Sequence, residues 1–109
     1  MVIPLPRPIE IYFAPDTARD PEALATCFAT DATVQDEGRT HAGLAAITAW
    51  KIEGRRKYEY TVEPLQAAQR GGKTVVTARV AANFPGSPVT LAFSFALRRD
   101  RIASLEIHS

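Results

Sequence analysis

The stretch FATDATVQDEGRTHAGLAAITAW, residues 28–50, carries the strongest structural signals in this sequence of 109 residues. Over residues 31–36 apolar and polar side chains alternate, which is typical of a strand with one buried face. Gly38 interrupts the alternation, and Gly43 ends the connection that we expect to follow. Over residues 44–56 the apolar side chains recur at helical spacing. The stretch therefore predicts a strand followed by a helix.

Two helices are expected before this stretch. Pro8 suits the first turn of a helix, and the apolar residues after it follow helical spacing. Pro15 lacks an N–H group and blocks simple continuation, so this helix should be short or kinked and end near Arg19. A second helix should have Asp20 as its N-cap and Pro21 as its first residue.

The second half of the chain is predicted to be β-structure. Alternating or β-branched runs indicate strands at residues 58–63, 74–82, 89–97 and 102–107. Glycine, proline and charged residues between these runs predict turns. Long antiparallel strands that follow three helices indicate an α+β fold with the helices on one face of the sheet.

Composition narrows the class of protein. The chain is 46% hydrophobic and 23% charged with a net charge of +1, which favours a globular domain and argues against disorder or nucleic-acid binding. No apolar run could span a membrane, and Met1–Pro8 does not look like a signal peptide. The lone Cys27 excludes an internal disulfide and should be buried and inert. We expect a single cytoplasmic domain over residues 1–109.

The motif F-x-x-D-A-x-V-x-D at residues 28–36, followed by G-x-x-A-I at residues 43–47, resembles the nuclear transport factor 2-like superfamily, in its SnoaL-like and ketosteroid isomerase-like branch. The resemblance implies a cone, in which a strongly curved antiparallel sheet wraps around N-terminal helices. It also implies a pocket at the open end of the cone and, as is common in that superfamily, a homodimer. A small apolar molecule is the expected ligand.

Asp36 is the first candidate catalytic residue. Period-2 counting places it on the same strand face as Val34, near the strand end where a cone would have its mouth. A partly desolvated carboxylate is a stronger base when ionised. In ketosteroid isomerases, which the sequence resembles, the corresponding acid shuttles a proton. The simpler alternative is that Asp36 begins a turn with Gly38 or pairs with Arg39.

Tyr12 and His41 are the candidate hydrogen-bond donors. Tyr12 lies on the inner face of the first helix, and its separation from Asp36 agrees with the tyrosine–aspartate pair of ketosteroid isomerases. Such a phenol could donate to a developing oxyanion, although an aromatic core residue is the alternative. His41 precedes the third helix and could form an acid–base pair with Asp36. Its alternative is an exposed loop histidine.

An apolar pocket is expected to draw its wall from Val34, Trp50, Tyr58 and Phe93. The resemblance places Phe93 where ketosteroid isomerases carry a protonated aspartate in the oxyanion hole. Phenylalanine cannot donate a hydrogen bond, which argues against steroid isomerase activity. The sequence holds no metal-ligand cluster, nucleophile elbow or phosphate-binding loop, so we expect neither metal nor cofactor.

Three functions remain open at this point. The first is a cofactor-free acid–base enzyme, of isomerase, cyclase or hydrolase type, acting on a small hydrophobic carbonyl compound. The second uses the same pocket to bind a small molecule without turnover. The third is a dimerisation or assembly module whose curved sheet is the working surface. The sequence leaves open whether the protein is an enzyme, because one fold hosts all three functions.

Overall fold

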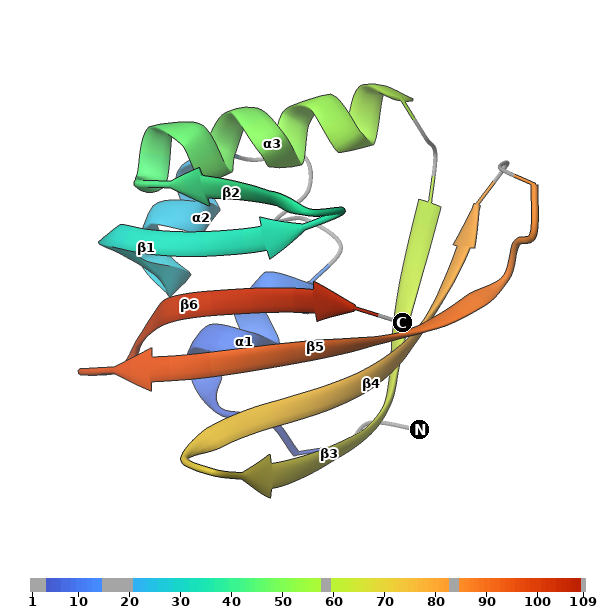
Figure 1. The fold of residues 1–109 in the computed structure, drawn as a ribbon. Coiled ribbons are helices and arrows are strands. Elements are labelled where there is room, and N and C mark those ends of the chain that lie inside the picture. Colours follow the sequence, from blue (N-terminus) through green and yellow to red (C-terminus); the bar gives the residue numbers. More distant parts are fainter. Residues whose placement is uncertain (1–3, 15–20, 58–59, 83–84, 109) are drawn as a thin grey trace.

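Three helices lie on one face of a curved six-stranded sheet in the computed structural model, which describes residues 4–14, 21–57, 60–82 and 85–108 (Figure 1). The helices are α1 (Arg7–Phe13), α2 (Pro21–Cys27) and α3 (Leu44–Lys57). The strands are β1 (Phe28–Asp36), β2 (Arg39–Ala42), β3 (Tyr60–Arg70), β4 (Lys73–Ala82), β5 (Val89–Arg98) and β6 (Arg101–His108). Their spatial order is β2-β1-β6-β5-β4-β3.

The predicted α+β class with a curved sheet is confirmed, and so is the antiparallel run of long strands in the second half. Neighbouring strands from β3 to β6 are antiparallel, as are β1 and β2. In contrast, β1 and β6 run parallel, so the sheet is mixed. The last strand, β6, lies between β1 and β5 and so joins the β1–β2 hairpin to the other strands of the sheet.

The segment after Asp36 was expected to be a connection, but it contains the strand β2. Glu37 and Gly38 have φ angles of 53° and 76° and form a two-residue turn between β1 and β2. Two successive positive φ angles match the right-handed twist of paired strands, so such a turn closes a hairpin. The hairpin pairs Val34 with His41 and Asp36 with Arg39.

The strand predicted at residues 58–63 is longer than expected and reaches Arg70. Beyond residue 63 the strand lacks hydrophobic alternation, and at Pro64 its register with β4 shifts before Gln66. Proline is tolerated because β3 is an edge strand and because a bulge absorbs the missing donor. Tyr58 lies outside the described residues.

The first helix ends at Phe13, earlier than the expected end near Arg19. Ala14 already has extended angles, φ −64° and ψ 136°. A residue that precedes proline is pushed out of the helical region, and Pro15 follows directly in the sequence. The second helix begins at Pro21 as predicted, while its expected N-cap, Asp20, lies outside the described residues.

The hydrophobic core lies between the helices and the concave face of the sheet. Tyr12 of α1 is 4% exposed, and its ring centroid lies 5.5 Å from that of Phe95 and 5.9 Å from that of Phe28. Both contacts are edge-to-face, the arrangement that aromatic quadrupoles favour. The first helix is therefore held to the sheet by an aromatic cluster.

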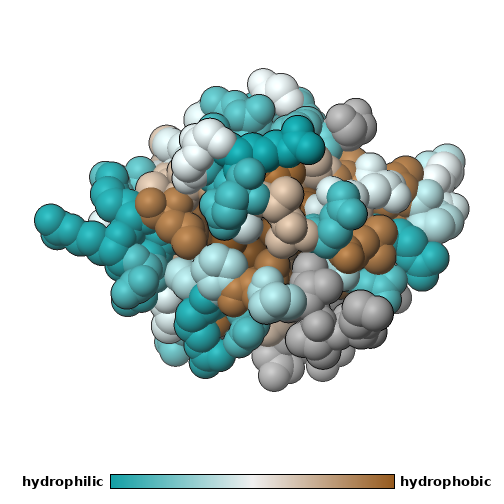
Figure 2. All heavy atoms as spheres, turned by 90° about the horizontal axis from the view of Figure 1, so that it is seen from below, coloured by the Kyte–Doolittle hydropathy of each residue, from teal (hydrophilic) through white to brown (hydrophobic). Residues whose placement is uncertain are grey.

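Large hydrophobic side chains that reach the surface are dispersed. On the side shown in Figure 2, hydrophobic areas are separated by hydrophilic side chains. Among the described residues the exposed large hydrophobic side chains are Ile52, Leu65 and Leu97, which belong to three different elements. No helix in the described parts of the chain is long and apolar enough to cross a membrane.

Cys27 is fully buried at the end of α2, which confirms the predicted burial. Its Sγ atom lies 3.6 Å from the carbonyl oxygen of Leu24. Burial raises the pKa of the thiol from 9.0 to about 11, because the thiolate would lose its hydration. The thiol therefore stays protonated, and inert as a nucleophile, at neutral pH.

This raised pKa predicts a loss of stability in alkaline solution. Between pH 9 and pH 11 the unfolded chain releases the thiol proton while the folded chain retains it, so the unfolded state gains stability as pH rises. The contribution of the protonated thiol to the free energy of unfolding is fully present below pH 9. About 2 kcal/mol of this contribution should be lost by pH 11.

Urea unfolding of the wild type and Cys27→Ala at pH 8 and at pH 11 measures this loss. Alanine lowers stability at both pH values because it leaves a small cavity, but it removes the thiol titration. The wild type should therefore lose about 2 kcal/mol more than the variant over this interval. Equal losses in the two proteins would show that the thiol is not the responsible group.

Candidate functional site

Asp36, Trp50 and His41 come together where β1 and β2 meet α3. The indole Nε1 of Trp50 donates a hydrogen bond to Oδ2 of Asp36 at 3.1 Å. The ring centroids of His41 and Trp50 are 5.8 Å apart, and the two planes are tilted by 34°. All three side chains are partly buried. A carboxylate, an imidazole and an indole thus share one corner of the fold.

The local sequence explains this convergence. Val34, His41 and Asp36 lie on one face of the β1–β2 hairpin, because His41 pairs directly with Val34. Gly43 then turns the chain from β2 into α3, with φ at +88° and its N–H bonded to the carbonyl of Ala32 at 2.8 Å. A positive φ of this size favours glycine. The helix that follows returns over β1 and brings Trp50 above Asp36.

The carboxylate of Asp36 is anchored through one oxygen. Oδ2 accepts the hydrogen bond from Trp50, and within the described residues Oδ1 has no hydrogen-bond partner. Arg39 is opposite Asp36 in the strand register, yet the two form no ion pair in the described part of the chain. Asp36 therefore has one oriented oxygen and one that a ligand could reach.

An open hollow of about 300 Å³ adjoins Asp36. It is lined by Gln35, Asp36, Glu37, Gly38, Arg39, Thr40, Glu106, Ile107 and His108. These residues come from the β1–β2 hairpin and the end of β6. The hollow therefore lies at the end of β1, where the alternation of the sequence placed Asp36. Its volume lies at the lower end of the range for small-molecule sites.

The four residues expected to form an apolar wall are not among those that line this hollow. Val34 is 0% exposed and Phe93 is 4% exposed, and both belong to the core cluster. Trp50 is partly buried against that cluster, and Tyr58 lies outside the described residues. Their role as a pocket wall stays a prediction.

Tyr12 faces inward as helical spacing predicted, but it faces the aromatic core. Its ring also lies close to Phe93, with centroids 6.3 Å apart. The aromatic partners of the Tyr12 ring are Phe13, Phe28, Phe93 and Phe95. Its role as an oxyanion donor stays a prediction, and the alternative of an aromatic core residue agrees with its burial.

Lys51 connects Tyr12 with the Asp36 corner. It is only 8% exposed, and its Nζ lies 4.4 Å from the ring centroid of Tyr12 and 5.7 Å from that of Trp50. Both distances suit a cation–π contact, in which the ring face attracts the ammonium group. Helical spacing predicted that the stem of Lys51 would face inward, but it gave no sign that the ammonium would lie over two rings.

Within the described residues, no three His, Cys, Asp or Glu side chains gather closely enough to hold a metal ion.

Solved structures share this curved-sheet architecture. An NTF2-like protein of unknown function from Cytophaga hutchinsonii matches with a TM-score of 0.70 at 15% identity, over 92% of this chain and 83% of that one. This likeness shows the fold alone. The model of the SnoaL-like domain family matches residues 10–105. The chain therefore belongs to the SnoaL-like domain family, which confirms the predicted resemblance.

Two further structures are more similar in sequence. A candidate polyketide cyclase from Sinorhizobium meliloti is 44% identical with a TM-score of 0.89, and the match covers 95% of each chain. A protein of ketosteroid isomerase-like fold from Catenulispora acidiphila, solved in complex with trimethylamine, is 25% identical with a TM-score of 0.81, over 97% of this chain and 87% of that one. None of the curated proteins matches the sequence. Family membership supports a small-molecule-binding or isomerase-type role.

Proposed function

We propose that this protein is a cofactor-free acid–base enzyme that acts on a small hydrophobic carbonyl compound, with Asp36 as the general base. The observation that carries the proposal is the hydrogen bond from Trp50 Nε1 to Asp36 Oδ2 at 3.1 Å. It fixes the plane of the carboxylate while Oδ1 stays available for a substrate proton. A base held in one orientation loses less entropy when it reacts.

In this mechanism Asp36 takes a proton from the carbon next to the substrate carbonyl. The C–H electron pair moves into the carbonyl group and gives an enolate, and the protonated Asp36 then returns its proton to the same or another carbon. His41 is the proposed donor to the enolate oxygen, since its ring lies beside Trp50. Tyr12 is the second proposed donor. The buried ammonium of Lys51 adds positive charge on the same side of the sheet, which favours an enolate.

The similar proteins agree with a small-molecule site in this fold. The relative at 44% identity is named as a candidate polyketide cyclase, and cyclisation of that kind would need a base beside a carbonyl compound. The protein that binds trimethylamine supports the alternative, in which the pocket holds a small molecule without turnover. The walls proposed for either role are Val34, Trp50, Tyr58 and Phe93.

Deuterium exchange into simple ketones tests the proposal without knowledge of the natural substrate. Cyclohexanone and acetophenone in D₂O are followed by proton NMR, and the protein should accelerate exchange at the carbon next to the carbonyl. Trp50 is the only tryptophan of the chain, so its fluorescence reports ligand binding at the same corner. If these ketones quench the fluorescence but cause no exchange, the proposed enzyme role is contradicted and the binding role is favoured. If these ketones cause neither quenching nor exchange, both the enzyme role and the binding role are contradicted for this class of compound.

We also propose that two copies of the chain form a homodimer. A domain of 109 residues buries only roughly 60–70% of the surface of its unfolded chain, and association adds to that burial. Sedimentation velocity should give a mass of twice the 11.9 kDa of one chain. A single species at the monomer mass, unchanged as protein concentration rises, would contradict the dimer.

A further inference from the structure

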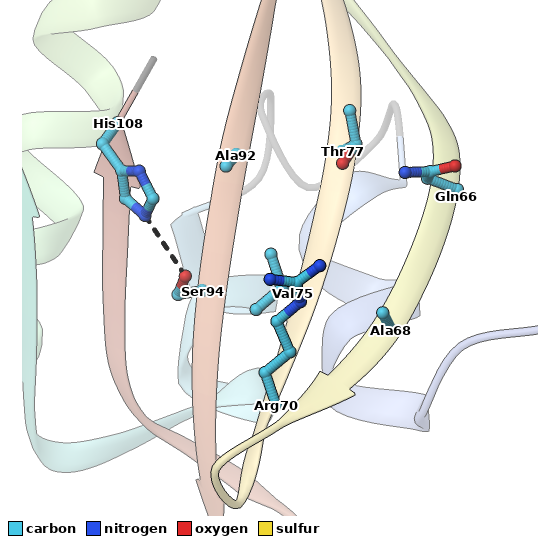
Figure 3. A pocket seen from close by; sticks show the side chains of 8 residues that line it. All are labelled: Gln66, Ala68, Arg70, Val75, Thr77, Ala92, Ser94 and His108. Carbon is cyan, nitrogen blue, oxygen red and sulfur yellow. Dashed lines mark hydrogen bonds between the residues drawn. The ribbon is translucent and has the colours of Figure 1, made fainter.

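A second hollow, of about 360 Å³, lies on the helix-free face of the sheet, over β3, β4, β5 and the end of β6 (Figure 3). It is lined by Gln66, Ala68, Arg70, Val75, Thr77, Ala92, Ser94 and His108. Its neighbours along the same strands, such as Val76 and Phe93, face the core instead. The hollow is therefore separated by the sheet from Tyr12, Trp50 and Lys51.

The strand register explains why these side chains share one face. Ala68 pairs with Val75, which pairs with Ser94. In the next row, Thr77 is the partner of both Gln66 and Ala92, and Ala92 also pairs with His108. Directly opposed residues point the same way from a sheet, so the two rows form a floor with a polar edge on either side.

The floor of the hollow is largely apolar, with Thr77 as its polar member, and its edge carries hydrogen-bonding groups. Ala68, Val75 and Ala92 offer only methyl groups. On the β6 side Ser94 Oγ and His108 Nε2 lie 3.4 Å apart. On the β3 side the guanidinium group of Arg70 extends in front of Val75, as Figure 3 shows. The lining includes no carboxylate side chain.

Two other arginines on the strands have acidic partners. Arg79 is paired with Glu63 at 3.7 Å, and Arg98 is paired with Asp31 at 2.6 Å. Within the described residues Arg70 makes no ion pair. A guanidinium group that overhangs an apolar floor without an acidic partner is suited to a ligand that supplies the carboxylate.

We propose that this hollow binds a small organic carboxylate. The carboxylate is held by Arg70, with Ser94 and His108 as further hydrogen-bonding groups, and the apolar body of the ligand lies on Ala68, Val75 and Ala92. Inorganic anions could use Arg70 but would leave the apolar floor uncovered, so they should bind more weakly. His108 also lines the hollow beside Asp36, but Arg70 and the apolar floor do not, so the proposal does not depend on the function proposed for Asp36.

Titration with benzoate, followed by amide chemical shifts and by calorimetry on the full chain, tests the proposal. We expect the amides of Ala68, Val75 and Ala92 to shift, with little change in the fluorescence of Trp50 on the other side of the sheet. Benzamide, which has the same body without the charge, should bind at least roughly tenfold more weakly. Ketone exchange at the Asp36 corner should proceed equally with and without benzoate.

Arg70→Gln supplies the decisive variant, because it removes the charge from an exposed side chain and keeps hydrogen-bonding groups. It should weaken benzoate binding by roughly tenfold or more. Lys73→Gln is the matched control, since Lys73 pairs with Arg70 across the turn, carries the same charge and does not line the hollow. Glu106→Gln should tighten binding. Glu106 is the register partner of Ser94, and its negative charge repels a carboxylate ligand.

Several results would overturn the proposal. Equal weakening by Arg70→Gln and Lys73→Gln would indicate general attraction of an anion and no built site. Equal binding of benzoate and sulfate would indicate that the apolar floor plays no part. If benzoate causes no shifts while Arg70→Gln changes the sedimentation coefficient, the hollow is a contact between two copies of the chain.

Discussion

Replacing Phe95 by alanine should lower the free energy of unfolding by about 3–5 kcal/mol. Phe95 is fully buried in the middle of β5. Its ring centroid lies 5.5 Å from that of Tyr12 and 5.8 Å from that of Phe13, so it is one of the sheet residues on which α1 packs. The variant loses the transfer free energy of the ring and leaves a cavity, and it also loses two edge-to-face contacts.

Urea unfolding monitored by circular dichroism gives this loss directly. Leu97→Ala is the matched control because Leu97 lies on the same strand, is 37% exposed and should cost less than about 1.5 kcal/mol. Near-ultraviolet circular dichroism should also weaken in Phe95→Ala, since Tyr12 and Phe13 each lose one aromatic partner. Similar losses in the two variants would show that the aromatic cluster does not anchor α1.

Sequence periodicity predicts those elements that have one buried face. The alternation of Val89, Leu91, Phe93, Phe95 and Leu97 predicts β5 because hydrophobic burial selects every second residue. Strand β2 and the extension of β3 beyond residue 63 were missed for the opposite reason. In β2 only His41 is even partly buried, and the second half of β3 is largely exposed, so neither carries a hydrophobic pattern. Backbone pairing to a neighbour holds both strands in the sheet.

Periodicity also predicts which face a side chain occupies, but not its neighbours. Asp36 was correctly placed on the Val34 face near the strand end, and Tyr12 on the inner face of α1. The contact between Asp36 and Trp50 depends on how α3 is rotated over β1, which no local pattern encodes. The depth of Tyr12 in the aromatic core depends in the same way on packing between α1 and β5. Long-range packing therefore sets the composition of the site.

Asp36→Asn should reduce the rate of protein-catalysed ketone exchange by about 10²–10⁴-fold, the usual contribution of a general base. Asparagine has nearly the same shape, and its amide oxygen can still accept the hydrogen bond from Trp50. The fold and the fluorescence of Trp50 should therefore change little. The variant lacks a basic oxygen, and the expected loss corresponds to about 3–5 kcal/mol in the activation free energy.

Asp31→Asn is the matched control for charge. Asp31 lies on the same strand and pairs with Arg98 at the exposed start of β1, so it is remote from the hollow beside Asp36. Exchange should be unchanged in this variant although its net charge changes by the same amount. Trp50→Phe separates orientation from basicity, because it keeps the carboxylate and removes the indole N–H. A lower turnover number with an unchanged KM in Trp50→Phe would mean that the indole acts by orienting Asp36. Exchange that persists undiminished in Asp36→Asn would assign the base to another residue.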